Sequence, residues 1–514
     1  METSYRDLNT VKASVPPSVR LSWRAWRLPV LVFAIGFAAA VILLSANNGF
    51  VSNDDYYHSR IAAQIIEQRA LRLDFPWLSL TILSPDQFVD HHLLYHLYLA
   101  PWAYWGGIAG AKIAHALVVG SVFVALWSLL DYLRVRSSLA WTVALLGVST
   151  PFLYRLLMVR TQAAALLLLL IALHLLFRRR HTLLLALAFA FTWLYNGFVL
   201  LPAVAVLYMI AVYPAERRLV WQPLAYVLAG TVLGLVINPY FPQNFAFIFS
   251  HLNEKIDVES SIRVGNEWYP YNTQALLTNS IGALLALAAG VLAPSFRKVQ
   301  RDSVETTLLL IALLTLYMTL ESRRFIEYFP AFALLYCAAA WGRSEVMGRD
   351  KPMFLPPPHM RRILLAGLML PLLLLVITTL SAVHNDIRSE KDAGYLAGAS
   401  RWLQENTEPG ALVFQTDWDD FTYLFFHNTY LTGLDPTYLQ IANPTLANLW
   451  VPITQGQVER PAALIRDIFG AVYVVSDTNH DAFAASASAD PDMELVYRDS
   501  NSLVWHVKPS ATAR

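Results

Sequence analysis

The chain has 514 residues, of which 56% are hydrophobic and only 15% are charged, and its mean hydropathy is +0.43. Soluble globular proteins carry about 25% charged residues, so this composition excludes an ordinary soluble enzyme. Lys and Arg number 38 against 37 Asp and Glu, which gives no basic field for a nucleic acid partner. A single cysteine, Cys337, excludes an intramolecular disulfide and a cysteine-based zinc site. The sequence therefore predicts a polytopic membrane protein.

Apolar runs long enough to cross a bilayer recur along the chain. A spanning helix needs about 20 apolar residues, because lipid offers the backbone no other hydrogen-bond partner. Residues 93–105 are apolar too, but His96 and Pro101 interrupt them, so we expect an interfacial helix there. We predict eleven spans, the third and fifth of them short, at residues 28–46, 110–133, 139–154, 161–177, 182–196, 197–213, 221–238, 273–294, 305–320, 325–342 and 363–383.

Positive charge in the loops predicts the orientation of these spans. Cytoplasmic loops are enriched in Lys and Arg, and here every second connection is basic. The pattern places residues 1–27 in the cytoplasm, a membrane domain at 28–383 with a long first external loop at 47–109, and residues 384–514 outside. The basic residues that set the alternation are Arg20, Arg24, Arg27, Arg134, Arg136, Arg178, Arg179, Arg180, Arg217, Arg218, Arg297, Lys298, Arg301, Arg343, Arg349, Lys351, Arg361 and Arg362.

The composition changes after the last span, and residues 384–514 predict a small α/β domain. A helix is expected over residues 394–405, before the breaker Pro409-Gly410, and another near 461–469. Strand-like runs occur at residues 411–415, 471–476 and 502–507.

A first cluster of candidate residues follows the first span immediately, in Ser52-Asn53-Asp54-Asp55-Tyr56-Tyr57-His58. Two adjacent carboxylates at a membrane surface repel each other, so a counter-charge, a metal ion or a proton is expected beside Asp54 and Asp55. The functional interpretation is a general base or metal ligand that faces an external cavity. The alternative is a solvated pair that caps a helix beginning near Tyr56, since Asp is a favoured cap.

Histidines gather at the other end of the same loop, in Asp90-His91-His92 with His96. His92 and His96 are four residues apart and share one face of a helix, a spacing that suits metal binding. A helix that carries histidines on its surface would give the same pattern.

Arginines also occur on the external side, where the orientation rule disfavours them. Arg155 and Arg160 flank the second external turn, and Arg323 and Arg324 open the tenth span. A guanidinium binds phosphate oxygens bidentately and stays charged, and ionisable groups at membrane level are functional candidates. We therefore expect phosphate binding, above all by Arg324. The alternatives are snorkelling to the headgroups and pairing with Glu321 or Glu327.

Two more acidic segments lie outside the spans. Glu267 begins the external stretch Glu267-Trp268-Tyr269-Pro270-Tyr271, whose aromatic residues also suit an interfacial belt. Asp417-Trp418-Asp419-Asp420 follows a predicted strand, and carboxylates around a tryptophan at a strand end form either a ligand edge or an acidic turn.

The acidic first external loop, the alternating spans and the external α/β domain together resemble the GT-C superfamily, and within it the catalytic subunit of oligosaccharyltransferases. Those membrane glycosyltransferases use polyprenyl-phosphate-linked sugars. Ser52-Asn53-Asp54 is similar to the family's first acidic motif, whose aspartate binds a divalent metal and contacts the acceptor. Arg324-Phe325 resembles its late-span stretch, where the arginine holds the lipid phosphate. Trp418-Asp419 stands where the family has its WWDYG motif, and Glu267 roughly where it has a loop glutamate.

The resemblance implies an α-helical polytopic membrane protein of about eleven spans with a C-terminal extracytoplasmic α/β domain, located in a bacterial inner (plasma) membrane. The expected activity is transfer of a sugar, with inversion, from a polyprenyl-(pyro)phosphate donor to a glycan, lipid or protein acceptor. The alternative is a transporter or lipid-linked-sugar flippase with an external sensor domain, although no repeat of half the chain length is visible.

The resemblance also implies a role for each candidate. Asp54 would be the base or metal-organising carboxylate, with Asp55 shaping its pKa. A divalent metal, Mg or Mn, would be held by Asp54, His92 and Glu267. The donor phosphate would be bound by Arg324, Arg160 and Arg323. The acceptor or substrate would be contacted by Glu267, Trp418, Asp419 and, in place of a second acidic motif that the next external turn lacks, Asp90 and His91.

The basic alternation makes the topology testable. A reporter fused after Leu380 that is active only outside the cytoplasm is expected to be active, because an odd number of spans precedes it. Activity of a reporter that works only in the cytoplasm would overturn the orientation, and with it the external site.

Overall fold

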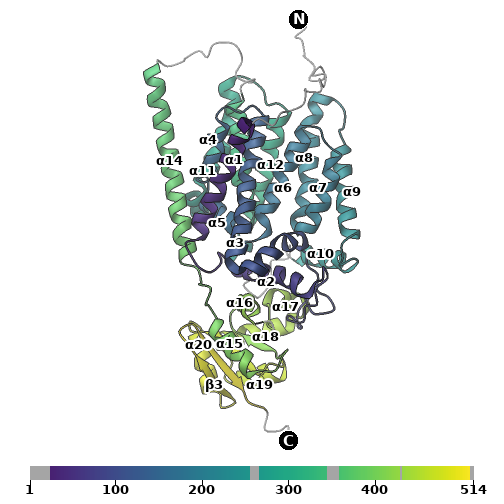
Figure 1. Ribbon diagram of the computed structural model, residues 1–514, viewed down its shortest axis with the longest axis vertical. Helices are drawn as coiled ribbons and strands as arrows, with labels where there is room; N and C mark the ends of the chain where they lie inside the picture. Colours follow the sequence, from purple (N-terminus) through teal and green to yellow (C-terminus); the bar gives the residue numbers. More distant parts are fainter. Residues whose placement is uncertain (1–22, 255–265, 344–357, 429–430, 510–514) are drawn as a thin grey trace.

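The structure is a computed structural model that describes residues 23–254, 266–343, 358–428 and 431–509. A bundle of long helices occupies the upper part of the molecule, and a small α/β domain lies beneath it at the end of the long axis (Figure 1). Of the described helices, six are long and apolar enough to cross a membrane, and the bent pair α5 and α6 makes a seventh. The protein is thus an α-helical polytopic membrane protein, as predicted.

The described helices of the membrane domain follow the predicted spans closely, and the count of eleven stays a prediction. Three of the helices, α7, α9 and α13, are apolar but shorter than a full span. The bounds are α1 Trp23–Leu44, α2 Asn53–Gln68, α3 Leu93–Tyr132, α4 Ser138–Ala144, α5 Thr150–Leu157, α6 Thr161–Phe177, α7 Leu183–Leu194, α8 Leu200–Glu216, α9 Gln222–Val236, α10 Gln243–Glu254, α11 Thr273–Arg297, α12 Ser303–Glu321, α13 Phe329–Gly342 and α14 Pro358–Arg388, with short 3-10 turns η2 Asn196–Val199, η3 Asn266–Trp268 and η4 Arg323–Glu327.

The third predicted span, residues 139–154, is not one helix. It divides into α4 and α5, because Ser149 caps α5 by accepting a hydrogen bond from the backbone of Phe152, and Pro151 occupies the first turn. The chain then bends by 105° between α5 and α6. This bend carries Arg160 at the start of α6.

Helix α3 contains the segment for which we expected an interfacial helix. Gly107, at φ 54° and ψ −141°, breaks the helical backbone, so the first part of α3 is separate from the spanning part that follows. Glycine adopts this positive φ without the steric cost that a Cβ brings. The first part packs against α2, with the rings of Tyr95 and His58 6.1 Å apart between centroids.

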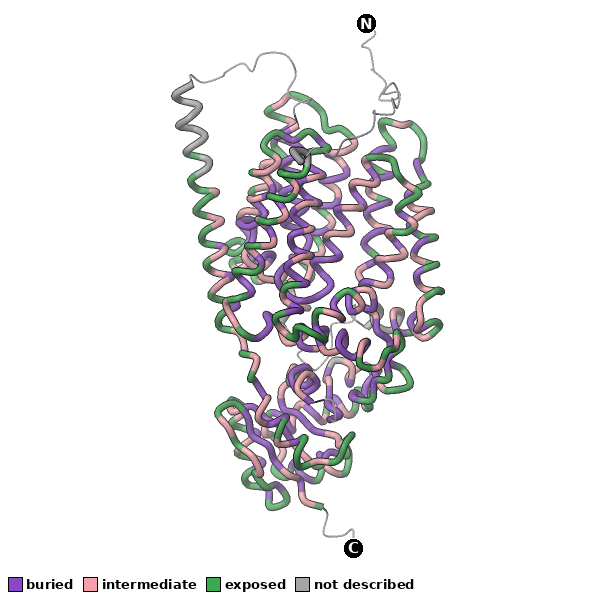
Figure 2. The backbone as a smooth tube through the Cα atoms, in the orientation of Figure 1, coloured by how far each residue is buried: buried purple, intermediate pink, exposed green. Residues whose placement is uncertain are grey.

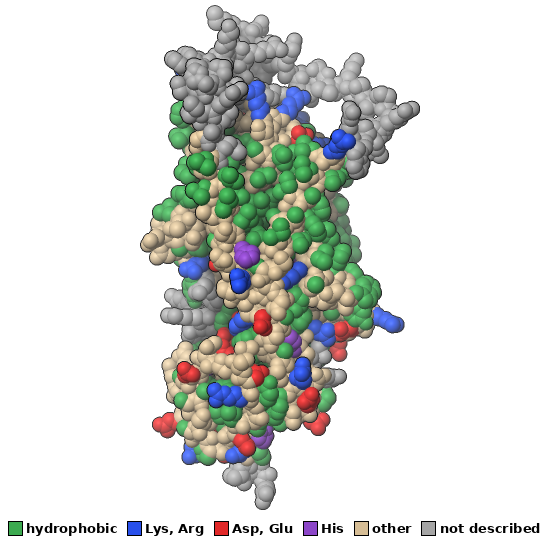
Figure 3. All heavy atoms as spheres, turned by 60° about the vertical axis from the view of Figure 1, so that its left-hand side comes forward, with side chains coloured by type: hydrophobic (Ala, Val, Ile, Leu, Met, Phe, Trp, Pro, Cys, Tyr) green, Lys and Arg blue, Asp and Glu red, His purple; other side chains and the backbone are tan. Residues whose placement is uncertain are grey.

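Apolar side chains cover much of the visible side of the bundle, while charged residues gather at its upper end and on the lower domain (Figure 3). Buried backbone fills the centre of the bundle, whereas α14 stands at one edge with an exposed and partly exposed surface (Figure 2). Leu370, Leu373 and Leu374 on α14 are more than half exposed. This distribution is the one that a lipid environment requires.

The C-terminal domain is built on a four-stranded sheet in the order β1-β2-β4-β3. Strands β1 and β2 are parallel, whereas β4 is antiparallel to both β2 and β3. Met493 is the only buried residue of β3, so this strand lacks the buried run by which the other strands were predicted. The bounds are α15 Ala397–Asn406, β1 Val413–Gln415, α16 Asp420–His427, α17 Pro436–Ala442, α18 Pro444–Thr454, α19 Pro461–Asp467, β2 Tyr473–Asp477, α20 Asp481–Ala489, β3 Met493–Arg498 and β4 Ser502–Val507.

Aromatic packing joins this domain to the helical bundle. Tyr56 of α2 lies 4.6 Å from Tyr423 and 5.2 Å from Phe426 of α16, measured between ring centroids. Such pairs add about 0.5–1.5 kcal/mol each to the free energy of area burial. Asn47 donates a hydrogen bond to the backbone carbonyl of Glu390 at 2.8 Å. Helix α2 is therefore fixed against the C-terminal domain on one face.

Candidate active site

Two aspartates open helix α2 and differ sharply in exposure. The helix begins at Asn53, so Asp54 and Asp55 stand in its first turn, where the helix dipole favours negative charge. The N-cap residue, Ser52, makes no side-chain capping bond. The side chain of Asp54 is 42% exposed, whereas that of Asp55 is fully buried. Asp54 therefore faces outward from the same turn that hides Asp55.

Arg160, at the bend between α5 and α6, holds this turn. Its guanidinium lies 2.8 Å from Oδ2 of Asp54 and 3.7 Å from Oδ1 of Asp55, and it donates a hydrogen bond to the hydroxyl of Ser52 at 2.6 Å. Burial raises the pKa of Asp55 to about 7, against the attraction of Arg160 and with repulsion from Asp54. Arg160 thus meets Asp54 and Asp55, which were predicted from a different part of the sequence. Asp55 changes charge near neutral pH.

Glu267 is the counter-ion that the arginines share. Its carboxylate lies 3.0 Å from Arg155, 3.5 Å from Arg160 and 3.5 Å from Arg324. Burial opposes ionisation of Glu267, but the attraction of Arg324, Arg155 and Arg160 outweighs it and holds the pKa well below its usual range. The hydroxyl of Ser322 donates to the backbone carbonyl of Glu267 at 2.8 Å, which ties this segment to the start of η4.

Arg324 is held on three sides and keeps one donor free. It donates a hydrogen bond to the hydroxyl of Tyr195 at 3.1 Å, and its guanidinium carbon lies 4.7 Å from the centre of the Trp268 ring. Its Nε is buried and has no hydrogen-bond partner among the described residues. Buried N–H groups are rarely left unpaired, so this donor is suited to a ligand oxygen.

The predicted pairing of Arg324 with Glu321 or Glu327 is not the main contact. Glu327 accepts a hydrogen bond from Nε of Arg155 at 2.7 Å, and Glu321 is exposed at the end of α12. Arg323 turns away, because it donates to the backbone carbonyl of Pro270 at 3.2 Å. We name the group of Asp54, Asp55, Arg155, Arg160, Glu267, Arg324 and Glu327 the arginine–carboxylate centre.

The histidines form a buried chain of hydrogen bonds beside this centre. Asp90 binds Nδ1 of His96 at 2.8 Å, and Nε2 of His96 lies 2.8 Å from Nδ1 of His58. His58 follows Asp54 by one helical turn of α2 and so shares its face. Burial keeps the pKa of His58 well below its usual value, and repulsion from His96 and Arg160 adds to this. The carboxylate of Asp90 and the rings of His96 and His58 are thus joined in one hydrogen-bonded chain, the connectivity that a proton relay requires.

The other predicted histidines lie at the edges of this arrangement. The ring of His92 stacks on that of Tyr195 at 5.6 Å, and the ring of His91 lies 5.0 Å from that of Phe247 in α10. His92 precedes α3 as its cap residue, with φ −121° and ψ 21°, rather than lying within the helix. Its backbone carbonyl nevertheless accepts a hydrogen bond from the backbone N–H of His96 at 3.0 Å, and the two rings lie 5.9 Å apart between centroids, so the two histidines are neighbours across one helical turn.

The predicted metal ligands do not fit a cation as they are arranged. Three guanidinium groups surround the carboxylate of Glu267, and Arg160 already pairs with Asp54. A divalent cation placed there would meet their positive charge at close range. Within the described residues, the acidic and histidine groups close enough to share an ion lie in the C-terminal domain and include none of Asp54, His92 and Glu267.

Trp418 and Asp419 lie at the carboxyl end of β1, in the turn before α16. Trp418 is 38% exposed, and Asp419 is 3.8 Å from the ammonium group of Lys391. No hydrogen bond or ion pair within the described residues joins them directly to the arginine–carboxylate centre. Their predicted role in acceptor binding stays a prediction.

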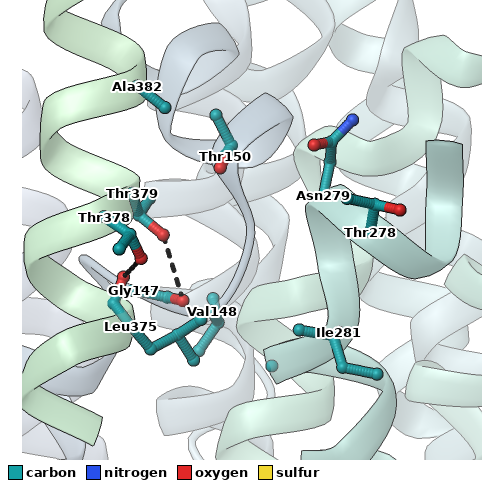
Figure 4. Close-up of a pocket in the computed structure, with 11 residues that line it drawn as sticks. Gly147, Val148, Thr150, Thr278, Asn279, Ile281, Leu375, Thr378, Thr379 and Ala382 are labelled. Atoms are coloured by element: carbon teal, nitrogen blue, oxygen red, sulfur yellow. Dashed lines mark hydrogen bonds between the residues drawn. The ribbon is translucent and has the colours of Figure 1, made fainter. Parts of the chain in front are cut away.

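A separate pocket of about 180 Å³ lies between α5, α11 and α14. Thr150, Asn279, Thr378 and Thr379 contribute its polar atoms (Figure 4). Thr379 donates to the backbone carbonyl of Gly147 at 3.4 Å, so part of this polarity is already satisfied. Its lining includes no residue of the arginine–carboxylate centre.

Tyr195 is the contact residue of the site that the sequence did not indicate, because its hydrogen bond with Arg324 arises only from the approach of η2 to η4. Arg155 was identified with Arg160 as an external arginine, and Glu327 as an alternative partner of Arg323 or Arg324. In the structure Glu327 accepts a hydrogen bond from Arg155 instead.

The fold has counterparts among solved structures. The oligosaccharyltransferase of Archaeoglobus fulgidus in the apo form matches with a TM-score of 0.61 at 14% identity, over 96% of this chain and 76% of that one. The same archaeal enzyme, AglB, in complex with an inhibitory peptide and a dolichol-phosphate gives a TM-score of 0.59 at 15% identity, over 91% and 72%. ArnT of Cupriavidus metallidurans, bound to undecaprenyl phosphate, gives 0.56 at 16% identity, over 94% and 98%.

The chain has the GT-C fold. This agrees with the expected fold class, including the C-terminal α/β domain. The sequence matches no protein-family model and no curated protein. The motifs have thus diverged while the GT-C architecture is kept over nearly the whole chain.

Glu267→Gln tests the shared counter-ion. The substitution keeps the shape but leaves three largely buried guanidinium groups without their common anion, and loss of one partner from a buried pair costs about 3–5 kcal/mol. We expect the melting temperature of the detergent-purified protein to fall by several degrees. Glu321→Gln, at an exposed position, is the matched control and should melt like the wild type. Equal melting of both variants would remove Glu267 from this role.

Asp55→Asn tests the buried carboxyl through pH. The pKa of Asp55 rises from 3.8 to about 7 in the folded protein. Between these values the folded state binds a proton that the unfolded state has released, so stability falls as pH rises. The melting temperature of Asp55→Asn relative to wild type should therefore be higher at pH 8 than at pH 5. A difference that does not change with pH would contradict the assigned protonation.

Proposed function

We propose that the protein is a membrane glycosyltransferase that takes its sugar from a polyprenyl-(pyro)phosphate donor at the external membrane face. The observation that carries this proposal is the unpaired Nε–H of Arg324 in the arginine–carboxylate centre. The GT-C fold supports it, since solved structures of this fold are bound to a dolichol-phosphate or to undecaprenyl phosphate.

The centre is suited to a phosphate leaving group. Breaking the bond between sugar and phosphate leaves negative charge on the phosphate oxygens, and preorganised cations stabilise such charge. Arg324 offers its free donor, and Arg160 lies on the same Glu267 carboxylate at 3.5 Å. Arg323, whose side chain turns to the Pro270 carbonyl, would meet the phosphate only from outside the centre.

Asp54 is the carboxylate that can meet an acceptor. It is 42% exposed, whereas Asp55 is buried beneath it. As a base it would take the proton of the acceptor while the acceptor attacks the sugar carbon from the side opposite the phosphate. A single displacement of this kind inverts the configuration at that carbon. Asp55 would tune the basicity of Asp54 through its own charge.

The acceptor is proposed to be a glycan, lipid or protein that reaches the site from the external side. One solved oligosaccharyltransferase of this fold carries a tethered acceptor peptide. In this chain the exposed Trp418 and its neighbour Asp419 provide an aromatic and acidic surface for such a group. Asp90 and His91 lie in the first external loop, at the end opposite to Asp54. We place the protein in a bacterial plasma membrane with residues 384–514 outside.

Two variants separate donor binding from transfer. Arg324→Lys keeps the charge but loses the planar fork, so binding of a polyprenyl phosphate to the purified protein should weaken about ten- to a hundredfold, as expected for one charged hydrogen bond. Asp54→Asn should bind the lipid normally and lose transfer.

Glu321→Gln, outside the centre, is the control for both measurements. The donor itself can be identified by deleting the gene and analysing which lipid-linked sugar accumulates. Undiminished lipid binding by Arg324→Lys would refute phosphate recognition by the fork. A flippase, in contrast, would show lipid movement without any transfer to an acceptor.

A further inference from the structure

A second group of acidic residues lies far from the donor centre in the chain, where two parallel strands end. Asp417, Asp419 and Asp420 follow β1, and Asp477 ends β2 beside it. One carboxylate oxygen from each of Asp417, Asp419 and Asp420 lies within 4.8 Å of the other two. Carboxylates held this close repel each other strongly unless a proton or cation lies between them.

Asp420 is the fully buried member of this group. Its side chain is fully buried, and Oδ1 accepts a hydrogen bond from the hydroxyl of Tyr395 at 3.2 Å. Its Oδ2 is also buried and has no hydrogen-bond partner among the described residues. A buried carboxylate oxygen without a partner loses its hydration and gains nothing in return. Oδ2 of Asp420 is therefore an unpaired acceptor that a cation can bind.

The positive charge nearby is too small to balance the group. Lys391 lies 3.8 Å from Asp419, and its ammonium also sits 4.0 Å from the centre of the Tyr395 ring. His480 is committed to Asp477, with Nδ1 2.5 Å from Oδ1. One lysine therefore faces three carboxylates.

We propose that Asp417, Asp419 and Asp420 bind one divalent cation of the oxygen-preferring class, with Ca²⁺ as the type, between the end of β1 and the start of α16. Ca²⁺ takes carboxylate and carbonyl oxygens in flexible geometry. The ligand set contains no nitrogen or sulfur, because the histidine of the neighbouring strand end already pairs with Asp477.

The experiment uses the full chain in detergent after treatment with a chelator. Ca²⁺ should raise the melting temperature, since a ligand of the native state stabilises it. Tb³⁺, which occupies calcium sites, should luminesce on tryptophan excitation and be displaced by Ca²⁺, because Trp418 lies within the ligand turn.

Variants make the test specific. Asp417→Asn and Asp420→Asn should each lose at least about tenfold in Ca²⁺ affinity, since loss of even outer partners of metal ligands costs 10–100-fold. Asp492→Asn, an exposed aspartate of the same domain, is the matched control. Trp418→Phe should lower the luminescence and keep the calcium-dependent melting shift.

Three results would overturn the proposal. The first is a wild type whose melting does not respond to Ca²⁺. The second is an Asp420→Asn variant that binds as well as wild type. The third is binding of Mn²⁺ or Zn²⁺ alone that depends on His480 rather than Asp420, which would assign the metal to the neighbouring group of Asp417, Asp477 and His480.

Discussion

One carboxylate contacts three arginines where η3, η4 and the bend before α6 meet, and the arrangement of the site depends on it. Glu267 meets Arg155 and Arg160 from the bend before α6 and Arg324 from η4. Like charges at this separation repel by several kcal/mol when water is partly excluded. Without a common anion the segments that carry these arginines would separate. Glu267 therefore sets the positions of the three arginines and stabilises the packing of the segments that carry them.

An incoming phosphate changes this balance. Bound as proposed at the free Nε–H of Arg324, it would add its negative charge to that of Glu267, while Glu327 and Asp54 also pair with Arg155 and Arg160. Asp55 changes its protonation near neutral pH. A proton on Asp55 removes a negative charge that would repel an incoming phosphate.

The sequence predicted the parts of this site better than their contacts. Asp54 was identified as a carboxylate directly beside a span. Arg160 and Arg324 were identified as arginines on the side of the membrane where the orientation rule disfavours them. Their assembly around Glu267 was not predictable, since it depends on the 105° bend before α6. That bend lies at residues 158–160, between α5 and α6. The apolar run 139–154 concealed a different break, between α4 and α5, which Gly147, Ser149 and Pro151 mark.

The histidine chain shows the same limit on a smaller scale. The four-residue spacing of His92 and His96 indicated neighbours on one helix face, and their rings lie 5.9 Å apart. The spacing did not indicate that His96 also binds Asp90 and, across the loop, His58. In the C-terminal domain the buried strands β1, β2 and β4 were visible as apolar runs, whereas the edge strand β3 was not.

The aromatic contact between α2 and α16 imposes an order on biosynthesis. Tyr56 hydrogen-bonds the backbone of Asp392, which is 336 positions later in the chain, and its ring partners in α16 come later still. At roughly 5–20 residues per second, the ribosome needs roughly 20–70 s to make that stretch. During this interval Phe50 and Tyr56 lack the ring partners that α16 provides. The contact that joins the two domains is therefore among the last that the new chain can form.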